Sequence, residues 1–335
     1  MVSGEKLNRF DEIVSEKIKS LICEEGKVKG SILSRFPLRL LTEIFRKREV
    51  FFEEPLIKVN LKRKATDLIF VGDLHGDYDS LLCVVSYIKD LVESKRSPFI
   101  VFLGDYVDRG PKQLECLAGA LVLAKDILPG RVVMLRGNHE TPSMNHYYGF
   151  YRDLINRYGT RRASIIYDTK ILPIYTSMPL AILIEDWRDN RIFGVHGGIP
   201  ITFEDSEWRT PSLKELTEVK LQKDYTSESY AFQMLWNDPD EYIEEYEHSF
   251  RGNGIYIFGS KIVEDFTKKN NINLIVRSHL AFRPHGFKIM FGGKLISIFT
   301  CRYYQVPPTI LHLTPKYMRI VDLDSGEALV ELSYQ

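Results

Sequence analysis

One repeated pattern constrains the fold of this chain more than any other feature. It is a short apolar run followed by a glycine-containing turn that carries oxygen and nitrogen donors. The pattern occurs after residues 68–71, 99–103 and 132–135. Apolar runs this short, rich in β-branched and aromatic residues and closed by glycine, predict buried strands. Ligand sites in α/β sheets collect at the carboxyl ends of such strands. We therefore expect the three turns to meet at one edge of a sheet.

The turns read Gly72-Asp73-Leu74-His75-Gly76-Asp77, Gly104-Asp105-Tyr106-Val107-Asp108-Arg109-Gly110 and Arg136-Gly137-Asn138-His139-Glu140. In an extended backbone Asp73 and His75 would project from one edge and bind one ion. Asp105 supplies a carboxylate that can bridge two cations, and Asn138 supplies a neutral carbonyl. The donors include no thiolate, which favours Mn²⁺, Fe or Zn²⁺ over a closed structural zinc site. One such turn occurs by chance on many loops, but three in order do not.

Amphipathic stretches separate the three predicted strands. Apolar residues recur at helical spacing over residues 81–92 and again over 114–128. The alternation of strand and helix predicts a βαβαβ unit with parallel strands and right-handed crossovers. Two later runs, 191–195 and 274–277, repeat the pattern and lead into His196 and His279. A lone histidine after a strand is usually a core residue, but here the order of the motifs favours a ligand.

The composition of the chain limits the class of protein to which it can belong and the kinds of partner that it can bind. The 335 residues are 44 % apolar with zero formal net charge, which gives no electrostatic case for nucleic-acid binding. The four cysteines are scattered without a CxxC pair and indicate reduced thiols of a cytoplasmic protein. No apolar run approaches membrane-spanning length, so we expect no membrane association.

The longer forms of the motifs resemble those of the PPP family of metal-dependent serine/threonine protein phosphatases. Within the broader metallophosphoesterases, Gly-Asp-Tyr-Val-Asp-Arg-Gly and Leu-Arg-Gly-Asn-His-Glu are characteristic of that family. The family motifs His-Gly-Gly, Leu-Trp-x-Asp-Pro and Arg-Gly match positions 196–198, 235–239 and 251–252. The resemblance covers residues 40–325.

The resemblance implies an α/β (α+β) fold of the metallophosphoesterase type, with two mixed β-sheets packed as a sandwich and flanked by helices. It also implies a single catalytic domain over residues 1–335. We expect residues 1–48 to form an N-terminal helical cap and residues 49–325 to form the phosphatase core. Apolar residues at helical spacing between positions 10 and 21 support the cap.

The resemblance further implies two divalent metal ions, Mn²⁺ in the first place, with Fe and Zn²⁺ as alternatives. One ion would be bound by Asp73, His75 and Asp105. The second ion would share Asp105 and would also be bound by three further residues, Asn138, His196 and His279. The ions would activate a hydroxide for direct attack on phosphoserine or phosphothreonine in proteins, without a covalent phosphoenzyme.

The remaining candidate residues would supply a proton to the leaving oxygen or bind the phosphate. His139 is the candidate general acid for the leaving oxygen, and Asp108 would orient its ring and favour its protonated form. Arg109 and Arg251 would bind the phosphoryl oxygens. Tyr304 either lines the pocket or has a structural role.

Three segments leave alternatives open. Residues 300–305 read Thr-Cys-Arg-Tyr-Tyr-Gln where the family usually has Ser-Ala-Pro-Asn-Tyr-Cys, so inhibitor sensitivity and peptide preference are not predicted. The acidic run 240–247 is either a solvated face or a groove that favours basic peptides. The aromatic stretch 141–158 is expected to pack behind the site rather than to stack on bases.

The leading hypothesis is a protein serine/threonine phosphatase with phosphoprotein substrates, and regulatory subunits are left open. The alternative is a small-molecule phosphoesterase such as a dinucleoside polyphosphatase on the same scaffold. A catalytically inactive binding module would lack a ligand or the acid, and none is missing. A nuclease is disfavoured by the neutral charge.

Overall fold

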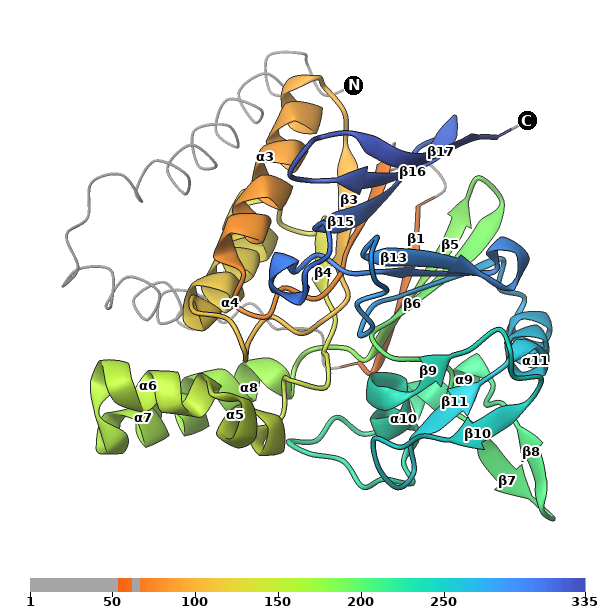
Figure 1. Ribbon diagram of the computed structural model, residues 1–335, viewed down its shortest axis with the longest axis horizontal. Coiled ribbons are helices and arrows are strands. Elements are labelled where there is room, and N and C mark those ends of the chain that lie inside the picture. Colours follow the sequence, from red (N-terminus) through yellow and green to blue (C-terminus); the bar gives the residue numbers. More distant parts are fainter. Residues whose placement is uncertain (1–53, 62–66, 335) are drawn as a thin grey trace.

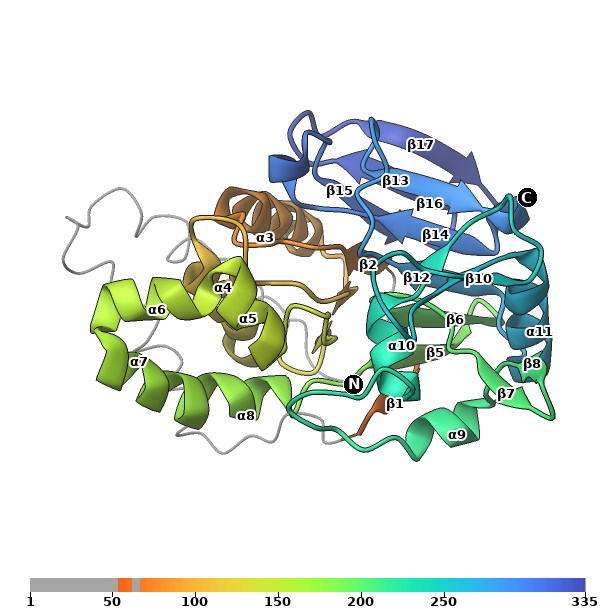
Figure 2. The same cartoon turned by 60° about the horizontal axis from the view of Figure 1, so that its bottom comes forward.

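The computed structural model describes residues 54–61 and 67–334. The predicted helical cap at residues 1–48 lies outside the described residues, so this division of the chain stays a prediction. Two six-stranded mixed sheets form the centre of the molecule, with helices beside them (Figures 1 and 2). The predicted α/β architecture with two mixed sheets is confirmed.

One sheet contains the strands that precede the three turns. Its strand order is β17 (Ala328–Ser333), β16 (Tyr317–Asp322), β15 (Thr309–Leu313), β2 (Asp67–Val71), β3 (Pro98–Phe102) and β4 (Val132–Met134). Strands β2, β3 and β4 are parallel, and helices α3 (Tyr78–Glu93) and α4 (Gln113–Val122) connect them. The predicted βαβαβ unit is therefore confirmed. The three C-terminal strands continue this sheet in antiparallel order.

The second sheet contains the strands that precede the two later histidines. Its strand order is β1 (Leu56–Asn60), β5 (Ala181–Trp187), β6 (Asn190–Val195), β12 (Leu274–Arg277), β14 (Leu295–Ile298) and β13 (Phe287–Met290). Strands β6, β12 and β14 run parallel, so their carboxyl ends lie at one edge.

The sheets pack face to face because their strands are apolar on both sides. Phe70 and Ile182 belong to the apolar layer between the two sheets. Their neighbours Ile69 and Leu183 point the other way, Ile69 toward the layer that contains α3 and α4 and Leu183 toward the layer that contains α11. This burial on both faces explains why these strands read as continuous apolar runs rather than as alternating ones.

Shorter elements surround the sandwich. On one side lie α5 (Pro142–Tyr148), α6 (Phe150–Tyr158), α7 (Thr160–Ile166) and α8 (Leu172–Tyr175), with the π-helical turns η2 (Leu123–Ile127) and η3 (Tyr167–Ile171). On the other side lie the helices α9 (Leu213–Thr217), α10 (Tyr230–Trp236) and α11 (Ser260–Asn270). The same side contains a hairpin of β7 (Thr202–Glu204) and β8 (Glu207–Arg209). It also contains a small sheet of β10 (Tyr246–His248), β11 (Tyr256–Phe258) and β9 (Asp238–Pro239). The 3-10 turns are η4 (Phe291–Gly293) and η5 (Arg302–Tyr304).

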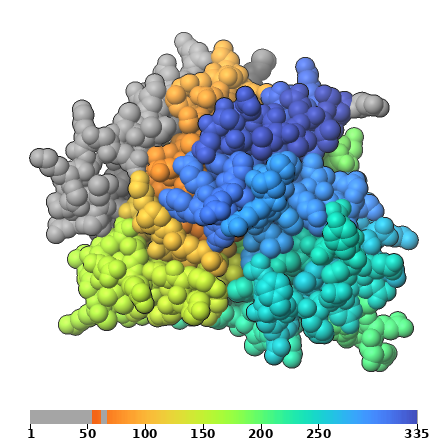
Figure 3. Space-filling model, viewed as in Figure 1, coloured from red at the N-terminus to blue at the C-terminus, as the bar shows by residue number. Residues whose placement is uncertain are grey.

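Segments far apart in the sequence meet on one face of the molecule. In Figure 3 the gold segment that follows β3 lies between the blue C-terminal part of the chain and the yellow-green helices α5 to α8. In the described part of the chain, no helix has the length and apolar character needed to cross a membrane.

Candidate metal centre and active site

The six predicted metal ligands come together in the structure. They follow the carboxyl ends of strands from both sheets: Asp73 and His75 follow β2, Asp105 follows β3, Asn138 follows β4, His196 follows β6 and His279 follows β12. All six are buried, with at most 9 % of any residue exposed. The carboxylate of Asp105 is central, because it lies close to histidines from both sheets.

The histidine rings are oriented by backbone carbonyls. Nδ1 of His75 lies 3.0 Å from the Val107 carbonyl, and Nδ1 of His196 lies 2.9 Å from the Leu103 carbonyl. In neutral rings these contacts place the proton on Nδ1 and leave a lone pair on each Nε2. Both Nε2 atoms lie 3.5 Å from the same atom, Oδ2 of Asp105. Neither neutral ring can therefore donate a proton to this carboxylate oxygen.

Other buried acceptors around this point also lack donors. Among the described residues, Oδ2 of Asp73, Oδ2 of Asp105 and Nε2 of His279 have no hydrogen-bond partner. Oδ1 of Asn138 lies 2.9 Å from Nε2 of His196, where the ring has no proton to donate. Buried acceptors without partners are costly and rare. Cations that accept these lone pairs would satisfy all of them, so the oxygen and nitrogen donors fit divalent metal ions.

The ionisation of these side chains also indicates a metal site. Burial lowers the pKa of His196 to about 3, and burial is also the main cause that lowers the pKa of His279 well below its ordinary value. Both imidazoles are therefore neutral, as metal ligands must be. Burial and then repulsion from Asp73 and Glu140 raise the pKa of Asp105 well above its ordinary value. A buried carboxylate with that environment needs a cation to stay ionised.

His139 and Asp108 form the predicted pair. Nδ1 of His139 lies 2.8 Å from Oδ2 of Asp108, and the amide of Asn145 donates to the same oxygen at 3.0 Å. The ring orientation is as expected. In the protein without cations, burial, followed by the charges of His75 and Arg109, lowers the pKa of His139 well below its ordinary value. The protonated imidazole expected of the general acid therefore stays a prediction for the protein with cations bound. Burial raises the pKa of Asp108 to about 6.

His139 also lies closer to the cluster than the sequence suggested. A ring nitrogen of His139 lies within 4.8 Å of ligand atoms of both His75 and Asp105. The rings of His139 and His75 have centroids 4.7 Å apart and meet edge to face. The candidate acid is thus in contact with the candidate ligands.

The predicted phosphate-binding residues lie around the same cluster. The guanidinium of Arg109 lies 4.2 Å from the ring centroid of Tyr148 and 5.8 Å from that of Tyr304. The Tyr304 ring stacks on His75, with centroids 5.5 Å apart and planes at 26°. Nε of Arg251 pairs with Asp238 at 3.1 Å. Burial is the main cause of the lowered pKa of His279, and the charge of Arg251 contributes to it, so this guanidinium lies near the cluster.

Backbone strain is concentrated here. Asp105, Asp108 and Arg109 have φ of +58°, +66° and +71°, in the left-handed region that non-glycine residues rarely adopt. The backbone is not extended at His75, which has φ +46° and begins a turn. The two side chains nevertheless converge, with Oδ2 of Asp73 3.5 Å from Nε2 of His75. A Cβ on Gly137 would come within 2.1 Å of Oδ1 of Asp105, so only glycine fits there.

Sequence reasoning missed residues that hold the ligands in place. The Glu140 carboxylate accepts the backbone N–H groups of Asp105, Tyr106 and Gly137 at 2.8–2.9 Å. The Ser278 hydroxyl donates to Oδ1 of Asp73, which also accepts the N–H of His279 at 3.0 Å. Both residues were visible as neighbours of predicted ligands, but their hydrogen bonds to other strands could not be read from the sequence.

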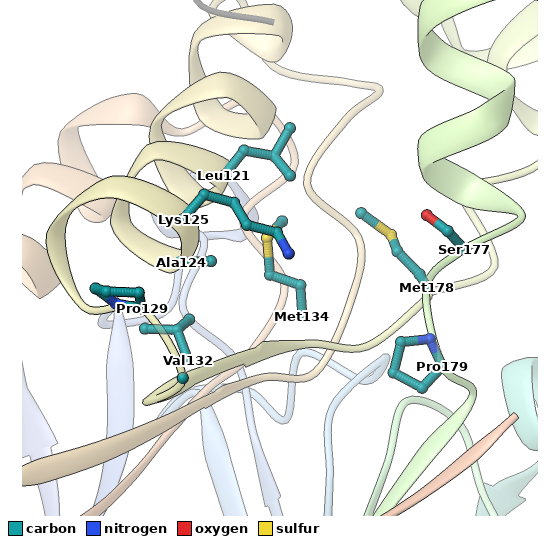
Figure 4. A pocket seen from close by; sticks show the side chains of 10 residues that line it. Leu121, Ala124, Lys125, Pro129, Val132, Met134, Ser177, Met178 and Pro179 are labelled. Atoms are coloured by element: carbon teal, nitrogen blue, oxygen red, sulfur yellow. The ribbon is translucent and has the colours of Figure 1, made fainter. Parts of the chain in front are cut away.

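Two other features of the surface lie outside this cluster. The acidic run 240–247 is partly neutralised, because Lys261 pairs with Glu244 and Glu245 and Lys288 pairs with Glu241. A pocket between the end of α4, η2, β4 and residues 177–179 is lined mainly by apolar side chains, as Figure 4 shows. None of the candidate site residues lines this pocket, so it offers no chemistry to the cluster.

Comparisons with known proteins agree with this geometry. Residues 66–281 match the family model described as calcineurin-like phosphoesterase. The chain is 32 % identical to the serine/threonine-protein phosphatase PP1-delta of Caenorhabditis elegans over 240 residues, which are 71 % of this chain and 70 % of that protein. It is 30 % identical to a probable serine/threonine-protein phosphatase of Encephalitozoon cuniculi (strain GB-M1) over 272 residues, which are 80 % of this chain. The matched part spans only about half (53 %) of that relative's length.

Solved structures share the fold. A protein serine/threonine phosphatase from Saccharomyces cerevisiae with similarity to human phosphatase PP5 superposes with a TM-score of 0.69 at 24 % identity, covering 90 % of this chain and 89 % of that chain. A cold-active protein-tyrosine phosphatase of a psychrophilic Shewanella species superposes with a TM-score of 0.52 at 20 % identity, covering 84 % and 82 % of the two chains.

Proposed function

Because this chain belongs to the calcineurin-like phosphoesterases, and within them to the serine/threonine-protein phosphatases, we propose that it hydrolyses phosphoserine and phosphothreonine in proteins. The observation that carries the proposal is the Asp105 carboxylate, which faces the lone pairs of His75 and His196 with no hydrogen-bond donor at its Oδ2 atom. A cluster with several buried acceptor atoms that lack donors is suited to binding cations and, through them, a phosphate dianion.

We assign the candidate ligands to two divalent cations, with Mn²⁺ as the first choice and Fe or Zn²⁺ as alternatives. Asp73, His75 and Asp105 would hold one cation. The other would be held by Asp105 together with Asn138, His196 and His279. When bound, the cations would neutralise the phosphate dianion and lower the pKa of a water molecule.

The residues of the chain itself would handle the proton and the phosphoryl oxygens. The ring of His139 is held by the carboxylate of Asp108, so the protonated ring would present its Nε2–H to the leaving serine or threonine oxygen. Arg109 and Arg251 each carry a planar guanidinium that can bind two phosphoryl oxygens. Arg109 lies against the ring of Tyr148, which fixes its direction without consuming its donors.

Exposed aromatic side chains support a substrate with large groups beside the phosphate. Tyr147, Phe250 and Tyr303 are 79 %, 93 % and 46 % exposed. Each directly precedes a residue of the candidate site, respectively Tyr148, Arg251 and Tyr304. Side chains of a phosphopeptide would contact these rings. A nucleobase would also stack on them, and this favours a dinucleoside polyphosphatase as the second candidate function.

We also propose binding partners and a cellular compartment for the enzyme. Its partners would be phosphoprotein substrates, and regulatory subunits are left open. The scattered cysteines favour the cytoplasm, because Cys116 and Cys301 are buried free thiols in the structure.

The test is phosphate release by metal-stripped protein with and without added Mn²⁺. The substrates are a phosphoserine/phosphothreonine peptide and a dinucleoside tetraphosphate. We expect Mn²⁺-dependent release from the peptide, reduced about 100-fold or more in His139→Asn. His248→Asn is the matched control, since His248 is exposed on β10. Preference for the dinucleotide would support the second candidate, and no Mn²⁺-dependent release from either substrate would contradict the proposed function.

A further inference from the structure

The loop that departs most from the family pattern, residues 300–305, carries the ring that covers the candidate site. Tyr304 is half-buried and stacks on His75 on one side. Its other neighbours are the ring of Phe299, edge-on with centroids 4.8 Å apart, and the guanidinium of Arg109. Tyr304 thus separates a candidate metal ligand from a candidate phosphate-binding residue. The position of its ring depends on η5, a single helical turn.

Arg302, the first residue of η5, is bound to two carboxylates that belong to other parts of the fold. Its backbone N–H donates to Oδ2 of Asp77 at 2.8 Å. Its guanidinium donates from Nη2 to Oδ1 of Asp324 at 2.7 Å, and Nη1 lies 3.8 Å from Oδ1 of Asp77. The Arg302 side chain is 26 % exposed. The turn is therefore held by both the backbone and the side chain of one residue.

Asp77 links η5 to the turn that carries His75. It is fully buried and forms the N-cap of α3, where its carboxylate accepts the N–H and the hydroxyl of Ser80. Its own N–H donates to the Leu74 carbonyl at 2.8 Å, closing the turn around His75. A buried carboxylate of this kind needs a positive partner, and Arg302 provides one.

Asp324 links η5 to the C-terminal hairpin. It lies in the turn between β16 and β17, where its N–H donates to Oδ1 of Asp322 at 2.9 Å. Figure 1 shows this turn and η5 on the side of the molecule where α3 lies. The Arg302 side chain therefore spans from the helix cap at the candidate site to the hairpin that ends the chain.

We infer that Arg302 is a positioning residue, which holds Tyr304 across the candidate site by bridging Asp77 and Asp324. This inference rests on the proposed phosphatase activity for its kinetic consequence, but not for its structural one. The Nε atom of Arg283 also donates to the Tyr304 carbonyl at 3.1 Å. That contact restrains the backbone after the turn, and the start of the turn is left to Arg302.

The kinetic test is a double-mutant cycle with a phosphopeptide substrate. We expect Arg302→Ala to lower kcat/KM about tenfold, because a displaced ring misplaces the substrate. In a Tyr304→Ala background the same change is expected to lower kcat/KM less than about twofold, since the residue acts through Tyr304. Arg302→Lys keeps the charge beside Asp77 and is expected to restore part of the loss. Arg319→Ala is the control, because it removes the Arg319–Glu331 ion pair of the same hairpin without touching η5.

A second test does not depend on activity. The thiol of Cys301, next to Arg302, is buried, and so is that of Cys116 in α4. With η5 released, we expect Arg302→Ala and Asp324→Ala to react at Cys301 with a maleimide about tenfold faster than wild type, while Cys116 is unchanged. Unchanged labelling of Cys301, or equal kinetic effects of Arg302→Ala with and without Tyr304, would overturn the inference. An inactive wild type with accelerated Cys301 labelling would instead contradict the proposed function alone.

Discussion

At the scale of single residues, we expect Asp105 to lower the stability of the metal-free protein while it serves as a ligand for both metal ions. Replacing it with asparagine would keep an acceptor for the His139 N–H and could turn an amide N–H toward the His75 and His196 lone pairs. We expect metal-free Asp105→Asn to be more stable than metal-free wild type by about 1–3 kcal/mol in urea unfolding. It should bind fewer than the two metal ions expected of wild type by elemental analysis. The exposed substitution Asp205→Asn is the control, and a less stable metal-free variant would contradict this account.

The same scale shows which site residues a sequence can reveal. Asp73, Asp105 and His196 were predictable because each donor directly follows an apolar run, and strand ends are where sites form. The role of Glu140 was not predictable, because its carboxylate accepts N–H groups of Asp105 and Tyr106 from a distant segment. The bond of Asp77 to the N–H of Arg302 is likewise distant, and such bonds have no signature in residue type or spacing. The lowered pKa of His139 in the protein without cations was not predictable either, because burial cannot be measured from a motif.

At the scale of elements, Arg277 joins β12 to Asp238, the carboxylate that also pairs with Arg251. Fully buried, it donates to the carbonyls of Gly197 and Asn237 at 2.6 and 3.1 Å and to Asp238 at 2.8 Å. We expect Arg277→Met to lower the free energy of unfolding by about 3–5 kcal/mol, because it leaves a buried carboxylate with less compensation. Arg319→Met, which removes an exposed ion pair, should cost at most about 1 kcal/mol. Equal losses in the two variants would contradict this role.

Elements were predicted well where they were long and periodic. The strands at β2 and β3 and the helices α3 and α4 follow directly from apolar spacing. The small sheet of β9, β10 and β11 was not predicted, because strands of two or three residues have too little pattern and are stabilised by pairing with distant segments. The turn at residues 72–77 was predicted, but the positive φ of His75 was not, since only the packed structure supplies the contacts that hold it.

At the scale of the whole molecule, the parallel βαβαβ unit could be derived from pattern alone, whereas the pairing of two sheets could not. Apolar runs that are buried on both faces show only that something covers each face. In this chain helices cover the outer faces and the sheets cover each other, as Phe70 and Ile182 show in the shared layer. The sandwich was expected only through the resemblance to the phosphatase family.

We expect the phosphopeptide substrate to contact side chains from different segments of the chain, such as Phe250 and Tyr147. We expect Phe250→Ala to raise KM for a phosphopeptide about threefold to tenfold, because a 93 % exposed ring can lose only contacts made by the substrate. KM for a small aryl phosphate, which reaches only the phosphate-binding residues, should change less than about twofold. Tyr242→Ala removes an equally exposed ring that adjoins no candidate site residue and serves as the control. A rise in KM for both substrates would mean that Phe250 orients Arg251 instead of contacting the peptide.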